Sequence, residues 1–183
     1  MGPHTRLRGE ERRLHLLEAA RQLFGERGYR GTEVEEVSRR AGVTKPILYR
    51  HFPGGKAHLF LAVLDGYLSD LLRVLWEALA SSTEPRERLR RGLGAYVRFA
   101  EQNPEGFHLL VDTSSDLDPE VGRRLRELRA TIAGGLANTI SDVMKGAGLP
   151  TEGAPIYAHV LVGGVEAVVR WWLEAGEPDR ERV

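Results

Sequence analysis

The side chains that could carry out chemistry in this chain favour binding over catalysis. His108 and Asp112 lie four residues apart, so a helix would place them on one face, where they could share a metal ion. Two ligands without a third make a poor metal site, and a surface pair is the better interpretation. The sequence holds no cysteine, glycine-rich phosphate loop, serine nucleophile elbow or zinc-type histidine pair. We therefore expect a protein that is not an enzyme and that uses neither a metal nor a cofactor.

A second group of polar residues suits the recognition of DNA. Thr44, Lys45 and Tyr49 follow a tight Ala-Gly-Val turn. Donors near the start of a helix can reach base edges once that helix lies in the major groove. Residues 1–56 hold 12 Lys and Arg against 7 Asp and Glu, whereas residues 57–183 hold 14 against 19. A basic head on an acidic body indicates a head that binds a polyanion.

Helices must position these residues, because every periodic stretch of the sequence has a helical period. Gly28 ends a first helix that begins near Glu10, and Thr32 with Glu35 forms a capping-box sequence for a second. Thr44 can cap a third, with a proline in its first turn. About five further helices are expected downstream. The first ends near Ala80, the second lies between Pro85 and Asn103, and the third follows Pro104. The fourth runs from Asp118 to Gly146, and the last begins at Pro155. The predicted fold is all-α, with a three-helix, homeodomain-like helix-turn-helix head and a helical-bundle body.

The head resembles one family closely. Ala20, Phe24, Gly28, Thr32, Val37, the run Ala41–Phe52 and Lys56 together are similar to the TetR family of bacterial regulators. The resemblance covers about residues 10–60. It implies that Thr44, Lys45, Pro46 and Tyr49 face the major groove and that Thr32, Tyr49, His51 and Lys56 touch phosphates. One departure is that Gly54 and Gly55 precede the fourth helix, where many members carry a Ser or Asp cap.

The expected domains are a DNA-binding head over residues 1–55 and a ligand-binding and dimerisation body over residues 56–183. Two glycine pairs, Gly134-Gly135 and Gly163-Gly164, lie inside predicted body helices, where each glycine costs about 1 kcal/mol relative to alanine. Close packing between helices would offset this cost. The resemblance adds an isologous dimer interface built by the last two helices, and we expect it to include Gly135, Val160, Gly164, Val168 and Trp172. The alternative is that the glycines relieve crowding within one monomer.

The resemblance also implies a small-molecule effector in the body. Large aromatic side chains, many of them with one polar atom, line many ligand pockets. The candidates in this chain are Tyr67, Trp76, Phe99, Phe107, His108 and Trp171. Such residues are also common in an ordinary core. No signal peptide and no membrane span are expected, so the predicted location is the cytoplasm. The resemblance implies a homodimer that binds a palindromic operator in double-stranded DNA, by family habit as a repressor. The alternative is a helical DNA-binding or protein-interaction module without an effector.

Overall fold

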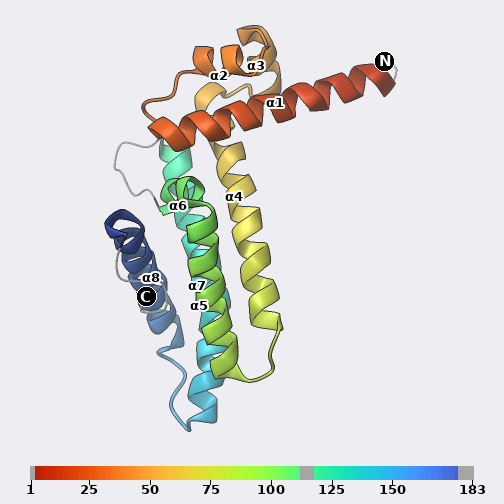
Figure 1. Cartoon of the computed structure of the whole chain (residues 1–183). Coiled ribbons are helices and arrows are strands. Elements are labelled where there is room, and N and C mark those ends of the chain that lie inside the picture. Colours follow the sequence, from red (N-terminus) through yellow and green to blue (C-terminus); the bar gives the residue numbers. More distant parts are fainter. Residues whose placement is uncertain (1–2, 112–117, 177–183) are drawn as a thin grey trace. The chain divides into compact units, whose positions relative to one another are not determined.

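Helices dominate the computed structural model of this chain, which describes the backbone of residues 3–111 and 118–176 and, within those ranges, side chains from residue 9 onward. Their order is α1 (Pro3–Arg27), α2 (Val34–Arg40), α3 (Lys45–His51), α4 (Gly55–Ala80), α5 (Pro85–Gln102), α6 (Pro104–Val111), α7 (Pro119–Gly146) and α8 (Ala154–Ala175) (Figure 1). No strand occurs in the described ranges, and the predicted all-α class is confirmed. The first helix begins at Pro3, earlier than its apolar pattern indicated.

The helices divide between two compact units, and the division runs through α4. One unit holds residues 1–67 and 112–123, and the other holds residues 68–111 and 124–183. The first half of α4 therefore belongs with α1, α2 and α3. The expected functional boundary between residues 55 and 56 falls at the start of α4 and stays a prediction.

The head is built on the buried face of α1. Phe24 is fully buried and meets Phe60 of α4 edge-on, with 4.8 Å between ring centroids. The helices α1, α2 and α3 contact one another (Figure 1), and Val37 and Leu48, both fully buried, fix the two short helices. Gly42 has a φ of 67°, a left-handed conformation that glycine adopts without strain, and it turns the chain between α2 and α3. These contacts form the expected helix-turn-helix.

In the second unit, α5 contacts both α6 and α8. Tyr96 of α5 packs edge-on against Phe107 of α6, with ring centroids 5.7 Å apart. Arg129 of α7 and Glu166 of α8 form a largely buried ion pair, with Nε and Oε2 3.1 Å apart. A polar contact therefore joins α7 to α8 in addition to the apolar packing of the body.

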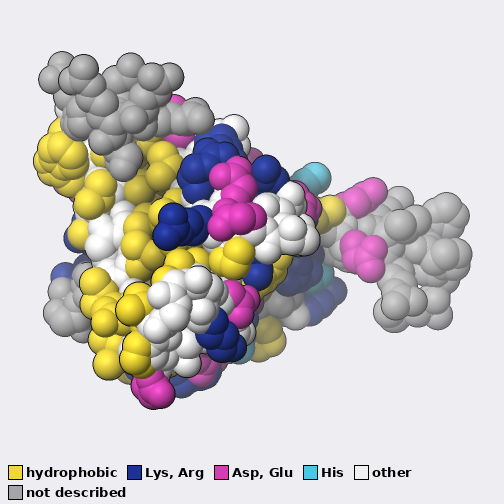
Figure 2. Space-filling model, turned by 90° about the horizontal axis from the view of Figure 1, so that it is seen from below, with side chains coloured by type: hydrophobic (Ala, Val, Ile, Leu, Met, Phe, Trp, Pro, Cys, Tyr) yellow, Lys and Arg dark blue, Asp and Glu magenta, His cyan; other side chains and the backbone are white. Residues whose placement is uncertain are grey.

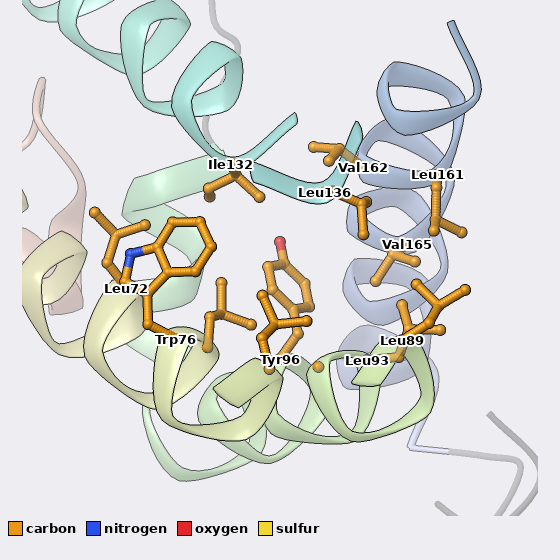
Figure 3. Close-up of a pocket in the computed structure, with 13 residues that line it drawn as sticks. Leu72, Trp76, Leu89, Leu93, Tyr96, Ile132, Leu136, Leu161, Val162 and Val165 are labelled. Atoms are coloured by element: carbon orange, nitrogen blue, oxygen red, sulfur yellow. The ribbon is translucent and has the colours of Figure 1, made fainter. Parts of the chain in front are cut away.

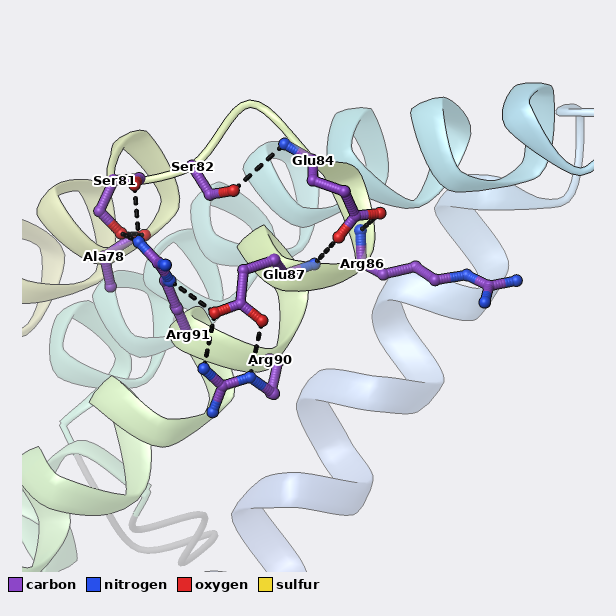
Figure 4. A network of polar contacts seen from close by, with 8 residues as sticks. All are labelled: Ala78, Ser81, Ser82, Glu84, Arg86, Glu87, Arg90 and Arg91. Atoms are coloured by element: carbon purple, nitrogen blue, oxygen red, sulfur yellow. Dashed lines mark hydrogen bonds and ion pairs between the residues drawn. The ribbon is translucent and has the colours of Figure 1, made fainter.

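A polar network fixes the turn between α4 and α5 (Figure 4). The Glu84 carboxylate caps α5 and accepts a hydrogen bond of 2.6 Å from the backbone N–H of Glu87. Arg91 donates to the Glu87 carboxylate at 2.8 Å and to the Ser81 carbonyl oxygen at 2.6 Å. Hydrogen bonds from Arg90 and Arg91 lower the pKa of Glu87 to about 2, so this carboxylate stays charged at ordinary pH. The end of α4 and the start of α5 are therefore held together.

Candidate nucleic-acid interface and effector pocket

One face of α3 packs into the head, and the other faces solvent. Leu48 is fully buried, whereas Thr44, Lys45, Pro46 and Tyr49 are exposed. Thr44 stands at the N-cap position with an extended backbone and, within the described residues, its hydroxyl makes no capping hydrogen bond. The four residues expected to face a DNA groove therefore lie on the outward side of this short helix, as predicted.

Tyr49 packs over the glycine that begins α4. A Cβ atom at Gly55 would come within 3.1 Å of the Tyr49 Cε1 atom, and Gly55 has a φ of 61°. The backbone N–H of Gly54 donates to Nδ1 of His58 at 3.1 Å. The His58 ring thus satisfies the N–H of the residue that precedes α4. Gly55 has a structural reason, because it lets the Tyr49 ring lie close to the backbone.

Lys45 has an acidic partner. Its ammonium group pairs with the carboxylate of Glu35, in the first turn of α2, and the two side chains remain 48% and 60% exposed. The hydrogen bond between them raises the pKa of Lys45 and lowers that of Glu35. The first residue of the outward helix is therefore held by a carboxylate on the neighbouring helix, a contact that the sequence pattern did not reveal.

Thr32 supports the head from inside. It is fully buried, and its hydroxyl donates to the carbonyl oxygens of Leu23 at 3.0 Å and Gly28 at 2.9 Å. The N-cap residue of α2 is Glu33, and no described side chain forms a capping hydrogen bond there. The predicted capping box of Thr32 and Glu35 is therefore wrong. The predicted phosphate contact of Thr32 stays a prediction, and in the free protein this side chain is buried.

Lys56 is engaged by the head itself. Its Nζ atom donates to the Arg30 carbonyl oxygen at 3.2 Å and lies 4.8 Å from the centroid of the Tyr29 ring. Burial raises the pKa of Tyr29, so the ring is a neutral phenol. Lys56 remains in the first turn of α4 and is partly exposed. A phosphate contact there stays a prediction, and it would compete with these two intramolecular contacts.

His51 belongs to a basic cluster that the sequence analysis missed. Burial, followed by the charges of Arg13, Arg50 and Arg12, lowers the pKa of His51 below its ordinary 6.5. The Arg13 guanidinium carbon lies 5.3 Å from the centroid of the Phe52 ring, which holds it beside the end of α3. Arginines from α1 and α3 together with a neutral imidazole donor suit backbone phosphates. The missed signal was the pair Arg12-Arg13, on a helix interpreted only for its apolar face.

The second unit contains an apolar pocket between α4, α5, α7 and α8 (Figure 3). It is lined by Leu72, Leu75, Trp76, Leu79, Leu89, Gly92, Leu93, Tyr96, Ile132, Leu136, Leu161, Val162 and Val165. Its cavity volume is about 60 Å³, small beside the roughly 300–1,000 Å³ of ordinary ligand pockets. Burial and then the charge of Glu166 raise the pKa of Tyr96, so no lining side chain is charged. The lining suits a hydrocarbon group.

Trp76 is the one member of the predicted ligand set that lines this pocket. Its ring is 42% exposed and packs against Gly135, where a Cβ atom would collide with the ring. The other five do not line it: Tyr67, Phe99 and Phe107 are buried in the packed core, and His108 and Trp171 are exposed to solvent. Tyr96, which does line it, was not among the candidates.

Helix α8 carries apolar side chains on two faces. Val160, Val168 and Trp171 are exposed by 68%, 45% and 54%, and a Cβ atom at Gly164 would meet open space. Figure 2 shows hydrophobic side chains gathered in patches on one side of the view. Length and composition alone would also allow α8 to cross a membrane. An apolar helix with one face in a core and the other against a partner chain has the same composition.

Two residues expected on the outward face lie elsewhere. Trp172 is only 8% exposed, so it is Trp171 that stands beside Val168 on the outer surface. Gly135 faces the Trp76 ring, and it is Gly134 that opens to solvent. In both places the adjacent residue is the exposed one. Adjacent positions on a helix point about 100° apart, so a shift of one residue moves a side chain to a different face.

Metal-ligating side chains do not gather in the described part of the chain, where no group of three or more His, Asp or Glu could hold an ion. His108 is exposed, and Asp112, its expected neighbour, lies outside the described residues.

Sequence comparison relates these features to known proteins. Residues 16–63 match the family described as bacterial regulatory proteins, tetR family, and residues 85–183 match the tetracyclin repressor-like C-terminal domain. The chain is 33% identical over 174 residues to the HTH-type transcriptional activator FasR of Mycolicibacterium smegmatis, which covers 95% of this chain and 78% of FasR.

Solved structures share the fold. AibR, solved in complex with isovaleryl coenzyme A and operator DNA, is 22% identical with a TM-score of 0.71, over 92% of this chain and 89% of AibR. FadR from Bacillus subtilis, in complex with stearoyl-CoA, is 14% identical with a TM-score of 0.74, over 89% of this chain and 88% of FadR. At these identities the likeness concerns the arrangement of helices alone.

Proposed function

The chain belongs to the TetR family of bacterial regulatory proteins and is a transcriptional regulator, and from this premise we propose how it works. Residues 1–55 read a palindromic operator, and residues 56–183 bind a small apolar effector and join two copies into a homodimer in the cytoplasm. The observation that carries the proposal is the outward face of α3 beside the basic cluster of Arg12, Arg13, Arg50 and His51. Base-reading donors next to phosphate-binding groups are what a sequence-specific head requires.

The operator is found by selecting bound sequences from a random double-stranded DNA pool, followed by titration of the winner in rising salt with competitor DNA. A palindrome held at physiological salt supports the proposal. Loss of all binding at that salt would indicate a merely electrostatic DNA binder. A folded chain that selects no sequence, with and without acyl-CoA, would favour the alternative of a protein-interaction module.

Tyr49 supplies a sharp test of the reading helix. Removing its side chain with Tyr49→Ala should cost about 1–3 kcal/mol of operator binding if it contacts the DNA. Tyr49→Phe is the matched control, because it keeps the ring over Gly55 and removes only the hydroxyl. Equal operator affinity in all three proteins would show that Tyr49 does not contact the DNA, and an unchanged affinity in Lys45→Ala as well would refute α3 as the reading helix.

The effector proposed here is an acyl group carried by coenzyme A. The support is the apolar lining of the pocket, together with the acyl-CoA molecules bound by AibR and FadR. Because the cavity of about 60 Å³ is too small for an acyl chain, binding would have to push helices apart. A ligand that binds only the widened body shifts the chain toward that conformation.

Isovaleryl-CoA and stearoyl-CoA are the probes for this step. Either should change tryptophan emission through Trp76 and change operator affinity. Leu93→Trp fills the pocket and should abolish both effects, whereas Leu149→Trp, on an exposed residue outside the pocket, should not. Effects that persist in Leu93→Trp would place the effector elsewhere. Reporter expression with and without the effective probe distinguishes a repressor from an activator such as FasR.

The dimer is proposed to form through the outer face of α8. The support is the exposure of Val160, Val168 and Trp171 and the open space at Gly164. Val160→Glu should produce a folded monomer by sedimentation at micromolar concentration, and Leu149→Glu, at another exposed apolar position outside this face, should remain dimeric. A monomeric wild-type chain would refute the dimer and leave the helix glycines to packing within one monomer.

A further inference from the structure

The Glu35–Lys45 ion pair differs from two ion pairs between α1 and α2 in where its cation lies. Glu36 pairs with Arg27 of α1 at 2.6 Å, and Glu26 of α1 pairs with Arg40 of α2 at 3.2 Å. These two pairs join α1 to α2. The partner of Glu35, in contrast, is the first residue of α3 and lies on its outward face.

This position gives Glu35 an influence on DNA binding. A lysine on the outward face of a reading helix attracts any phosphate backbone, whatever the sequence, and so adds to non-specific affinity. A carboxylate paired with it offsets that attraction. Both side chains are about half exposed, so the pair is accessible to a third group without unfolding of the head.

The pair also has a chemical match in the major groove. It places a donor and an acceptor side by side, Lys45 Nζ and the Glu35 carboxylate. A G·C pair presents acceptors at guanine O6 and N7 and a donor at the cytosine amino group on the same edge. An A·T pair also places an acceptor beside a donor, at adenine N7 and N6, but it offers the lysine one acceptor where guanine offers two, and it carries the thymine methyl group.

We infer that Glu35 is a specificity-determining residue, which holds Lys45 back from phosphates and, together with it, reads a G·C pair in each operator half-site. This rests on the proposed function, because it requires that α3 enters the groove. On DNA, Lys45 donates to guanine and Glu35 accepts from cytosine, so the intramolecular pair is exchanged for two matched contacts, most completely at a G·C pair.

The test repeats the random-pool selection with the full-length wild type, Glu35→Gln and Glu33→Gln. Glu33 is the matched control: it is exposed at the N-cap of α2, its charge raises the pKa of Lys45, and within the described residues it has no ion pair or capping bond. In Glu35→Gln we expect the G·C preference at one position per half-site to be lost. Glu33→Gln should retain it.

Non-specific binding supplies a second readout. Releasing Lys45 should steepen the salt dependence of Glu35→Gln by about 0.9 in log–log slope, so that its affinity relative to wild type grows about 3.5-fold between 200 and 50 mM salt. The double variant Glu35→Gln/Lys45→Gln should lose this gain, because the effect acts through Lys45.

The outcomes separate this inference from the proposed function. If wild type selects no palindrome, the proposed function fails. If wild type selects one and Glu35→Gln selects the same bases, or if both glutamine variants behave alike, the head reads DNA but Glu35 acts only through net charge, and the inference is overturned. Circular dichroism of each variant confirms that these exposed substitutions leave the helices folded.

Discussion

Replacing Thr32 with valine tests whether this residue holds the head together or contacts DNA. Valine has the same branched shape, so Thr32→Val removes the hydroxyl and little else. That hydroxyl donates to the carbonyl oxygens of Leu23 and Gly28, at 3.0 and 2.9 Å, from a fully buried position. Within the described chain the Gly28 carbonyl accepts no backbone hydrogen bond outside the helices, so Thr32 is its partner at the end of α1.

The magnitude follows from what is lost. A typical internal hydrogen bond contributes about 1 kcal/mol, and leaving a buried polar group without a partner costs about 1–3 kcal/mol. We therefore expect Thr32→Val to lower the free energy of unfolding by about 1–3 kcal/mol. For a chain of this size, each kcal/mol corresponds to a thermal midpoint lower by about 2–4 °C. Thermal and urea denaturation followed by circular dichroism, at a fixed protein concentration, measure it.

Thr44→Val is the control, because Thr44 is exposed and its hydroxyl caps nothing in the described structure. Its stability should change by less than about 0.5 kcal/mol, while its operator affinity falls. Folded Thr32→Val should keep the wild-type operator affinity and salt slope. The opposite pattern, wild-type stability in Thr32→Val with a weakened operator affinity, would show that Thr32 contacts DNA and would refute its role inside the head.

Two further predictions concern His51 and Gly135. The pKa of His51 is lowered in the free protein, and a phosphate beside the ring would raise it again. Operator affinity should therefore rise as the pH falls through the pKa of His51 in the DNA-bound state. His51→Gln should abolish that rise, and identical pH profiles for wild type and variant would exclude the contact. Gly135→Ala should displace the Trp76 ring, alter tryptophan emission and lower the free energy of unfolding by about 1–3 kcal/mol through overpacking. Gly134→Ala, whose added Cβ atom meets open space, should stabilise the helix by up to about 1 kcal/mol. Equal stability of the two variants would contradict the packing of Trp76 on Gly135.

The sequence predicted which side of α3 faces outward, because its apolar and polar residues separate with the helical period. Leu48 lies on the apolar face shared with Val37, and Tyr49 is turned outward from it, so helical periodicity alone separates buried from exposed. Thr32 shows where such logic ends. A threonine before a glutamate has the pattern of a capping box, but the same hydroxyl can serve the end of the preceding helix, and only the three-dimensional turn decides between them.

The body was harder to predict, since α8 is apolar on more than one face. Trp171 and Trp172 are both large and apolar, and periodicity gives no reason to prefer either for the core. Gly134 and Gly135 present the same ambiguity. Pocket residues such as Trp76 and Tyr96 come from helices distant in sequence, so their meeting depends on packing angles that local patterns do not contain.

The outer face of α8 also bears on how the protein behaves in a cell. Large apolar side chains left in water promote aggregation, so a newly made single copy is at risk until that face is covered. If a second copy covers it, the stability of the regulator depends on its own concentration. A cell that makes few copies would then hold less of the folded protein than a simple count suggests, and degradation of unassembled chains would sharpen the response of the regulated promoter to changes in its synthesis.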